Sequence, residues 1–122
     1  MTQPLALLLY EKLLPGTQLK NRLQDMGWRV HTLHEGSALT RAAEEHKPVI
    51  ILVDMASKAE SVSEGISQLR GNSSTTHIPI IAFGGDEISH AAATNAGANL
   101  VVSDAAILQH LGQFIDQALS DF

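Results

Sequence analysis

Asp54 is the residue of this chain whose position most clearly suggests chemistry, because it directly follows five aliphatic residues, VIILV at 49–53. An unbroken aliphatic run of this length is typical of a strand that is covered on both faces of a parallel sheet. A carboxylate at the end of such a strand can act as a nucleophile, contribute to a metal site, or accept hydrogen bonds from loop amides. The sequence therefore predicts an acid at the carboxyl edge of a sheet, and the groups around it decide its role.

Short apolar runs that alternate with helical patterns place Asp54 in a sheet of five strands. The predicted strands cover residues 5–11, 28–35, 49–54, 78–85 and 99–103. Helical spacing of apolar residues follows each strand, at Leu19, Leu23 and Met26, over 37–47, at Val62, Ile66 and Leu69, over 86–95, and from Ile107 through Leu111 and Ile115 to Leu119. Alternation of this kind indicates a parallel sheet. We therefore expect one α/β domain over 1–122, a doubly wound five-stranded parallel sheet with helices on both faces.

Residues with restricted or unusual backbone preferences predict where several helices begin and end. Pro15 and Gly16 are expected to form the turn that precedes the first helix, and Pro48 is expected to stop the second. Asp86 is expected to cap the amino end of the fourth helix, and Gly97 to end that helix.

The composition indicates a folded globular protein and excludes some classes of site. Of the 122 residues, 44% are hydrophobic and 17% are charged, so the chain can bury a core. It has no cysteine, which excludes disulfides, thiolate chemistry and cysteine-ligated metals. Its apolar runs are far shorter than the roughly 20 residues that span a bilayer. The start of the chain also lacks the pattern of a signal peptide. We expect a cytoplasmic protein that does not contact membranes.

Charge is unevenly distributed along the chain. The net charge is −5, and residues 71–122 contain no lysine or arginine. The acids of this segment are Asp86, Glu87, Asp104, Asp116 and Asp121. A surface built by the last third of the chain is therefore acidic or apolar, and it has no cation with which to bind phosphate. We expect no nucleic-acid partner.

Several short motifs, taken in order, resemble one known family. Besides Asp54 at the end of the third strand, they are GW (27–28), HEGSAL (34–39), HIPII (77–81) and NAGAN (95–99). With the alternating strands and helices, they resemble the receiver domain of bacterial two-component response regulators, the CheY-like domain with a flavodoxin-like fold. The resemblance covers nearly the whole chain.

The resemblance implies a phosphorylation site at the carboxyl edge of the sheet, where ligands of open α/β sheets bind. In the family an aspartate carries the phosphoryl group, and an acidic pair after the first strand holds Mg²⁺. A hydroxyl after the fourth strand and a lysine after the fifth contact the phosphoryl oxygens. The corresponding positions here are Asp54 for the acceptor, Tyr10 and Glu11 for the acidic pair, Gly84 for the hydroxyl, and Ser103 or Asp104 for the lysine.

Most of these positions have lost the chemistry that the family requires, and only Asp54 and Glu11 retain it. Loss of one preorganised donor from a charge-stabilising site typically costs about 10²–10³ in rate. Lys12 and Lys58, expected on loops at the same edge, are the cations that could compensate. We expect Asp54 to be vestigial and the ring of Tyr10 to lie half-buried where a metal would otherwise sit. We expect no catalytic residue, no enzyme activity, no cofactor and no metal; a metal, if held, would bind Glu11 and Asp54.

The six histidines suggest no second site. His31 and His34 are three residues apart on a predicted strand, so they face opposite sides and make a poor metal pair. No GxSxG motif places a serine nucleophile, and no GxGxxG or GxxxxGK[ST] pattern occurs.

Three functions are compatible with these observations. The favoured one is a stand-alone pseudo-receiver, a protein-interaction module of signal transduction that works without phosphorylation. The alternative is an atypical receiver that is still phosphorylated on Asp54, with Mg²⁺, in a two-component phosphorelay. The third is a small-molecule or enzymatic module on a flavodoxin-like scaffold, which no motif supports.

The face made by the fourth helix, fifth strand and fifth helix is the expected partner surface, because the resemblance assigns signalling contacts to it. This segment has acids but no cation. A partner with a basic or apolar patch would therefore be complementary to it. A symmetric dimer held by salt bridges through the same face is disfavoured, since acids would meet acids.

Overall fold

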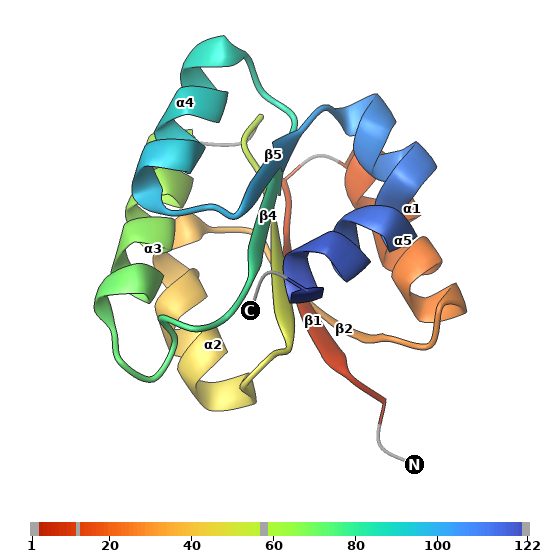
Figure 1. The fold of residues 1–122 in the computed structure, drawn as a ribbon, viewed down its shortest axis with the longest axis horizontal. Helices are drawn as coiled ribbons and strands as arrows, with labels where there is room; N and C mark the ends of the chain where they lie inside the picture. Colours follow the sequence, from red (N-terminus) through yellow and green to blue (C-terminus); the bar gives the residue numbers. More distant parts are fainter. Residues whose placement is uncertain (1–2, 12, 57–58, 121–122) are drawn as a thin grey trace.

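The computed structural model describes residues 3–11, 13–56 and 59–120, which form one sheet flanked by two layers of helices (Figure 1). The strands are β1 (Leu5–Leu9), β2 (Arg29–Leu33), β3 (Ile50–Asp54), β4 (Ile80–Phe83) and β5 (Leu100–Val102). The helices are α1 (Leu13–Asp25), the 3₁₀ helix η1 (Gly36–Ala38), α2 (Leu39–His46), α3 (Ala59–Gly71), α4 (Glu87–Ala96) and α5 (Asp104–Ser120). The predicted fold class is confirmed.

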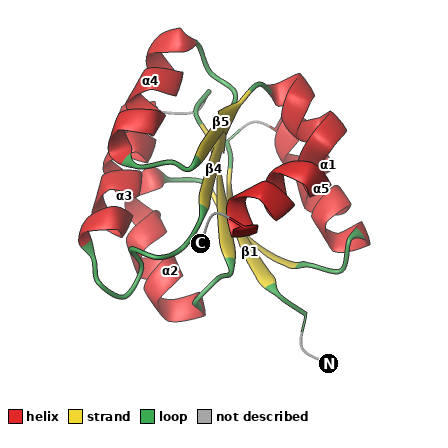
Figure 2. Ribbon diagram, in the orientation of Figure 1, coloured by secondary structure: helices red, strands yellow, loops and turns green. Residues whose placement is uncertain are grey.

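All neighbouring strands are parallel, and their order is β2-β1-β3-β4-β5. The chain therefore moves outward from β1 in both directions, which places helices on both faces: α1 and α5 on one, α2, α3 and α4 on the other (Figure 2). The central strand β3 is fully buried because both of its faces are covered. Its carboxyl end, where Asp54 lies, is beside the ends of β1 and β4.

Each face of the sheet packs its own hydrophobic core. Alternate residues of the strands point to opposite faces, so Leu7 and Val53 pack with α2, α3 and α4, whereas Leu8 and Phe83 pack with α1 and α5. The two cores fix the positions of the strand ends, and these ends in turn fix the loops at the carboxyl edge.

The first turn of α1 contradicts one prediction. Pro15 and Gly16 were expected to precede the helix, but α1 begins at Leu13 and includes both. A proline is tolerated there because the amide groups of the first turn have no partner within the helix. The predicted second helix is also divided, into η1 and α2. It ends at His46 and is followed by the C-cap residue Lys47, whose φ is +50°.

The predicted ends of α4 are confirmed. The side chain of Asp86 accepts a hydrogen bond from the amide of Ser89 at 2.8 Å, which caps the helix. Gly97, with φ of +121°, ends it and donates its amide to carbonyls of the last turn. In the described part of the chain, none of the helices has both the length and the apolar character needed to cross a bilayer.

Candidate functional site

Asp54 lies at the carboxyl end of β3 and is completely buried. Its Oδ1 atom accepts a hydrogen bond from the backbone amide of Ala56 at 2.9 Å. The next residue, Met55, donates its amide to the carbonyl of Phe83 at 2.8 Å, so the chain after β3 stays tied to the end of β4. The structure thus holds the carboxylate of Asp54 in a defined place at the sheet edge.

Gly84, directly after β4, brings two carboxylates together. A Cβ atom on this glycine would lie 2.9 Å from Oδ1 of Asp54 and 2.6 Å from Oδ1 of Asp104. The two oxygens can therefore be no farther apart than the sum of these distances. Asp104 therefore presents negative charge to the expected phosphoryl position.

The backbone of Gly84 also disfavours a side chain. Its φ is +73° and that of Gly85 is +81°, in the left-handed region that L-residues with a Cβ atom rarely adopt. A serine or threonine at position 84 would meet both this strain and the two carboxylates. Position 84 thus lacks the hydroxyl residue that the family resemblance implies, and the backbone of this turn disfavours a serine or threonine there.

Ser103 and Asp104 have different roles at the start of α5. Ser103 is exposed, and its Oγ atom accepts a hydrogen bond from the amide of Ala106 at 3.1 Å, as expected of a helix cap. Asp104 is half-buried, and its Oδ1 atom is buried without a hydrogen-bond partner among the described residues. Of the two residues on which the lysine position could fall, Asp104 is therefore the one whose side chain faces Asp54.

Tyr10 is more buried than expected. Its exposed fraction is 9%, and the prediction of a half-buried ring is wrong because α1 begins early enough to cover it. A Cβ atom on Gly16 of α1 would lie 2.2 Å from the ring, so only glycine fits there without movement. On its other side the ring meets His34 edge-on, with 5.2 Å between ring centroids. Nδ1 of His34 donates a hydrogen bond to the carbonyl of Tyr10 at 2.7 Å.

Glu11, the second acid expected near Asp54, is exposed and lines a different cavity. This cavity has a volume of about 230 Å³, and its lining includes Glu35 and Ser61 but not Asp54. The carboxylate that the structure places beside Asp54 is that of Asp104. Lys12 and Lys58, the two candidate compensating cations, lie outside the described residues.

These residues do not fit the magnesium site that the family resemblance implies. In the described ranges, no group of three or more histidine, aspartate or glutamate side chains could hold a metal ion. A packed tyrosine ring stands at the first acidic position, and Oδ1 of Asp54 is engaged by a backbone amide. Magnesium requires several oxygen ligands in near-octahedral geometry.

The sequence did not reveal the interactions of two side chains, His90 and Arg70. His90 fixes a loop at the carboxyl edge of the sheet, and Arg70 fixes loops at the amino edge. Nε2 of His90 donates a hydrogen bond to the carbonyl of Gly84 at 2.8 Å and so fixes the turn between β4 and α4. At the other end of the sheet, Arg70 donates to the carbonyls of Gly97, Thr76 and Ile78 and to Oδ1 of Asn99. Asn99, which closes the NAGAN motif, thus accepts a hydrogen bond from the guanidinium group of Arg70. The two residues are 29 positions apart, so the sequence did not reveal this role of Asn99.

His31 and His34 behave separately, as expected for residues on opposite sides of a strand. His34 contacts Tyr10, whereas the ring of His31 stacks on that of His46 of α2, with 4.1 Å between centroids. The stacking of His31 and His46 was not anticipated, because the two are distant in sequence.

Comparisons with known proteins identify the fold. No family model matches the sequence, and no curated protein matches it either. Solved structures do match: the receiver domain of a sensor histidine kinase from Pseudomonas aeruginosa has a TM-score of 0.87 and 19% identity, covering 98% of this chain and 99% of that one. This chain has the fold of a receiver domain.

Two other solved structures support the receiver fold. The signal receiver domain of a histidine kinase from Syntrophus aciditrophicus has a TM-score of 0.82 and 18% identity, covering 97% of this chain and 91% of its own. The chemotaxis protein CheY4 of Vibrio cholerae has a TM-score of 0.81 and 18% identity, covering 97% and 100%. The Pseudomonas domain has a magnesium ion coordinated in its active-site cleft. In this chain, Tyr10, Gly84 and Asp104 lie at the carboxyl edge of the sheet.

Proposed function

We propose that this protein is a pseudo-receiver, a non-enzymatic protein-interaction module of cytoplasmic signal transduction that works without phosphorylation. The observation that supports this most strongly is the carboxylate of Asp104, which lies beside that of Asp54 across Gly84. A phosphoryl group on Asp54 would bring further negative charge to a place where the family supplies a cation.

The size of the expected defect supports the loss of phosphotransfer rather than a slower version of it. One missing donor in such a site costs about 10²–10³ in rate. Here the hydroxyl, the lysine and one metal-binding carboxylate are all replaced, and Asp104 adds repulsion. The contributions of groups that act together do not simply add.

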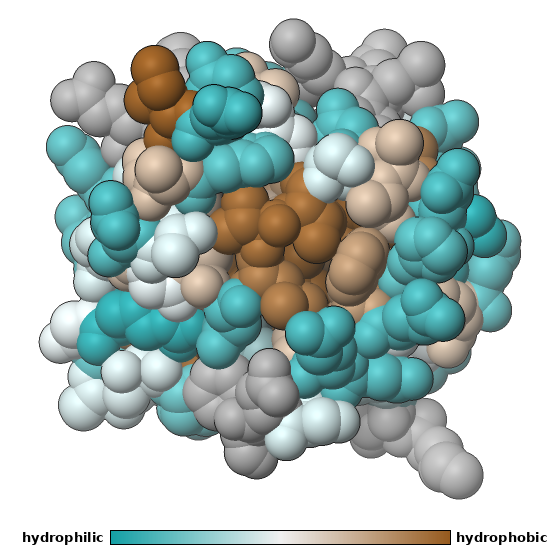
Figure 3. Space-filling model, turned by 45° about the horizontal axis from the view of Figure 1, so that its top comes forward, coloured by the Kyte–Doolittle hydropathy of each residue, from teal (hydrophilic) through white to brown (hydrophobic). Residues whose placement is uncertain are grey.

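The proposed partner surface is the face formed by α4, β5 and α5. Figure 3 shows hydrophobic surface at the centre of this face, between the two helices. The edge strand β5 contributes three half-buried aliphatic residues, Leu100, Val101 and Val102, and one of its two sides has no neighbouring strand. Uncovered apolar surface on an edge strand is a favourable site for association.

Charge determines which partners suit this face. The segment 71–122 has no lysine or arginine, and Arg70, directly before it, points its guanidinium group at backbone carbonyls. A protein with a basic or apolar patch is therefore the proposed partner. The same charges disfavour nucleic acid and disfavour a salt-bridged dimer through this face.

Incubation of the purified protein with acetyl phosphate and Mg²⁺ tests the loss of phosphorylation. We expect no gain of one phosphoryl group in the intact mass, because Asp104 and Gly84 give no stabilisation to the transferring group. The variant Asp104→Lys should raise the labelled fraction, since it removes the repelling carboxylate and supplies a cation.

The neighbouring variant Ser103→Lys is the matched control, because Ser103 is exposed and caps α5. It should leave labelling at the background level. In the Asp104→Lys background, Asp54→Ala should abolish any labelling. Wild-type labelling that depends on Asp54 would contradict the proposal.

The alternative function is an atypical receiver phosphorylated on Asp54 with the help of Mg²⁺. The position of Asp54 at the carboxyl end of β3, in a receiver fold, is the observation that favours it. Asp54-dependent labelling of the wild-type protein would select this alternative.

A further inference from the structure

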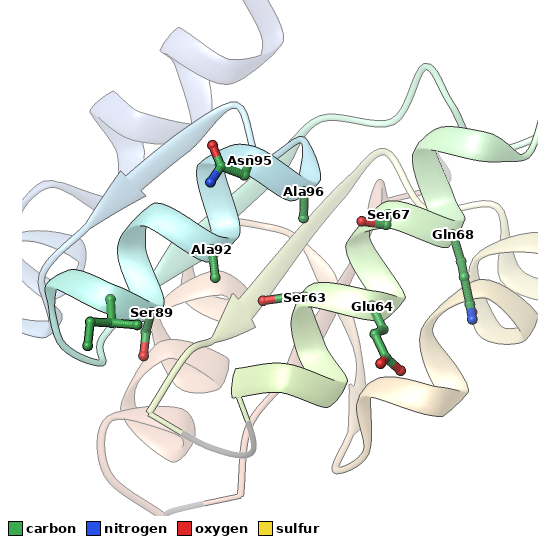
Figure 4. A pocket seen from close by; sticks show the side chains of 9 residues that line it. Ser63, Glu64, Ser67, Gln68, Ser89, Ala92, Asn95 and Ala96 are labelled. Carbon is green, nitrogen blue, oxygen red and sulfur yellow. The ribbon is translucent and has the colours of Figure 1, made fainter.

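A groove between α3 and α4 lies on the opposite side of α4 from β5. It has a volume of about 690 Å³. Figure 4 shows that small side chains line the space between the two helices, with Ser63 and Ser67 on α3 and Ala92 and Ala96 on α4. Because these side chains are small, the helices leave a channel between them that a larger side chain would fill.

The groove offers an apolar contact that the described chain does not use. Ile88 lines one end of it and is 80% exposed, the largest exposed fraction among the bulky hydrophobic residues of the described chain. Oγ of Ser63 is buried, and none of the described residues forms a hydrogen bond with it. The exposed isoleucine favours a partner that covers this end of the groove.

One acid lines the groove, and two more lie near one end of it. Glu64 on α3 lines it, and Asp86 and Glu87 lie at the start of α4 beside Ile88; all three are exposed. Hydrogen bonds from the amide and the hydroxyl of Ser89 lower the pKa of Asp86, so this cap is ionised at neutral pH. Arg70 of α3 does not balance these charges at the groove, because its guanidinium group is bound to carbonyls near Gly97.

From this geometry we infer that the groove receives a basic amphipathic helix of a partner protein. Small residues on two adjacent helices let a third helix approach closely, with its apolar ridge in the channel. Lysine or arginine residues that flank the ridge would face Glu64 and would lie near the acids at the start of α4, Asp86 and Glu87. A second copy of this chain is a poorer occupant, because its own groove carries the same negative charges. The inference rests on the proposed function as an interaction module, and it adds a second docking surface together with the chemistry of the helix that binds there.

The length of α4 sets the size of the probe. Its ten residues correspond to about 15 Å of helix, so a partner helix of three to four turns would span the groove. The probe is an acetylated and amidated peptide of about 14 residues, with leucines at i, i+3, i+4 and i+7 and lysines elsewhere on its flanks. A second peptide has glutamates in place of the lysines.

Titration of the isotope-labelled protein with each peptide, followed by amide chemical shifts, tests the inference. The lysine peptide should give saturable shifts in the segments 63–68 and 88–96 and should bind at least tenfold more tightly than the glutamate peptide. Ile88→Ser should weaken binding about tenfold through the loss of apolar contact. Ala92→Trp should abolish binding, because its indole fills the channel.

Matched variants separate this site from non-specific attraction. Met26→Ser removes another exposed hydrophobic residue, 45% exposed and outside the groove, and should leave binding unchanged. The double variant Glu64→Lys, Glu87→Lys should bind the lysine peptide about tenfold more weakly. Chemical shift changes confined to residues 100–111 would show that the groove is not the binding site, and so would unchanged binding by the Ala92→Trp variant. Either result would leave the proposed function standing. Failure of the proposed function would instead appear as phosphorylation of Asp54, independently of whether the peptides bind.

Discussion

Replacement of Gly36 by alanine is expected to lower the free energy of unfolding by about 2–4 kcal/mol. A Cβ atom at this position would lie 2.5 Å from the carbonyl oxygen of Ser61 and 2.8 Å from the amide nitrogen of Val62. These are backbone atoms of α3, so the clash cannot be relieved by rotating a side chain. Gly65 meets the carbonyl of Gly36 from the opposite direction, at 2.7 Å from its own Cβ position. The two glycines let η1 pack directly on α3.

Urea denaturation followed by circular dichroism measures this effect. Gly71→Ala is the matched control, because a Cβ atom on Gly71, at the end of α3, would have no neighbour within 4 Å. The free energy of unfolding of Gly71→Ala should fall by well under 1 kcal/mol, or rise, because alanine is a better helix former than glycine. Equal stability of the Gly36→Ala and Gly71→Ala variants would show that η1 does not pack on α3 in this way.

Arg70→Met is expected to cost about 3 kcal/mol, the second large effect. Arg70 connects three segments: its Nε donates to the carbonyl of Gly97 at 2.9 Å, and its Nη1 donates to that of Ile78 at 2.7 Å. Its Nη2 donates to Oδ1 of Asn99 at 2.6 Å, and the same oxygen accepts the amide of Ile80. Methionine keeps the apolar stem but removes the Arg70 donor from the carbonyls of Gly97 and Ile78, whereas Oδ1 of Asn99 keeps the amide of Ile80. Each unsatisfied buried group costs about 1–3 kcal/mol.

Thermal and urea unfolding of Arg70→Met and Arg70→Lys measure this effect. Lysine should restore only part of the stability, because one ammonium group cannot reproduce the fork of guanidinium donors. Arg41→Met, at an exposed position of α2, is the control and should be close to neutral. Wild-type stability in Arg70→Lys would mean that the charge, rather than the set of hydrogen bonds, is what matters.

The fold could be predicted from the sequence because its signals are local. The aliphatic run before Asp54 indicated a strand covered on both faces, and β3 is buried throughout. The acid at position 86 and the glycine at 97 have the backbone roles that their types favour. The prediction failed at Pro15 and Gly16, where a turn signal lies inside the first turn of α1, because a proline in that turn breaks no hydrogen bond.

The candidate site was less predictable because it depends on contacts between distant segments. The sequence left the lysine position open between Ser103 and Asp104, and only the start of α5 shows that Asp104 faces Asp54. The burial of Tyr10 depends on Gly16 of α1, and the shape of the turn at Gly84 depends on His90. Residue types could be read from the sequence, whereas the directions of their side chains could not.

The site and the surface lead to one account of how the protein works. In the receiver domains that this sequence resembles, a hydroxyl after the fourth strand and an aromatic residue on the fifth relay phosphorylation to the face made by the fourth helix, fifth strand and fifth helix. Here the hydroxyl position is Gly84, and β5 has only aliphatic residues. We therefore expect this face to hold one conformation and to be regulated by the concentration of its partner.

Addition of beryllium fluoride, a phosphoryl mimic, with Mg²⁺ to the isotope-labelled protein tests this account most directly. If no phosphoryl site remains, the amide resonances of Asp54, Gly84 and Val102 should not move at any concentration of the mimic. Saturable shifts at these residues that require Mg²⁺ and spread into α4 and α5 would contradict the account and establish a working phosphorylation switch.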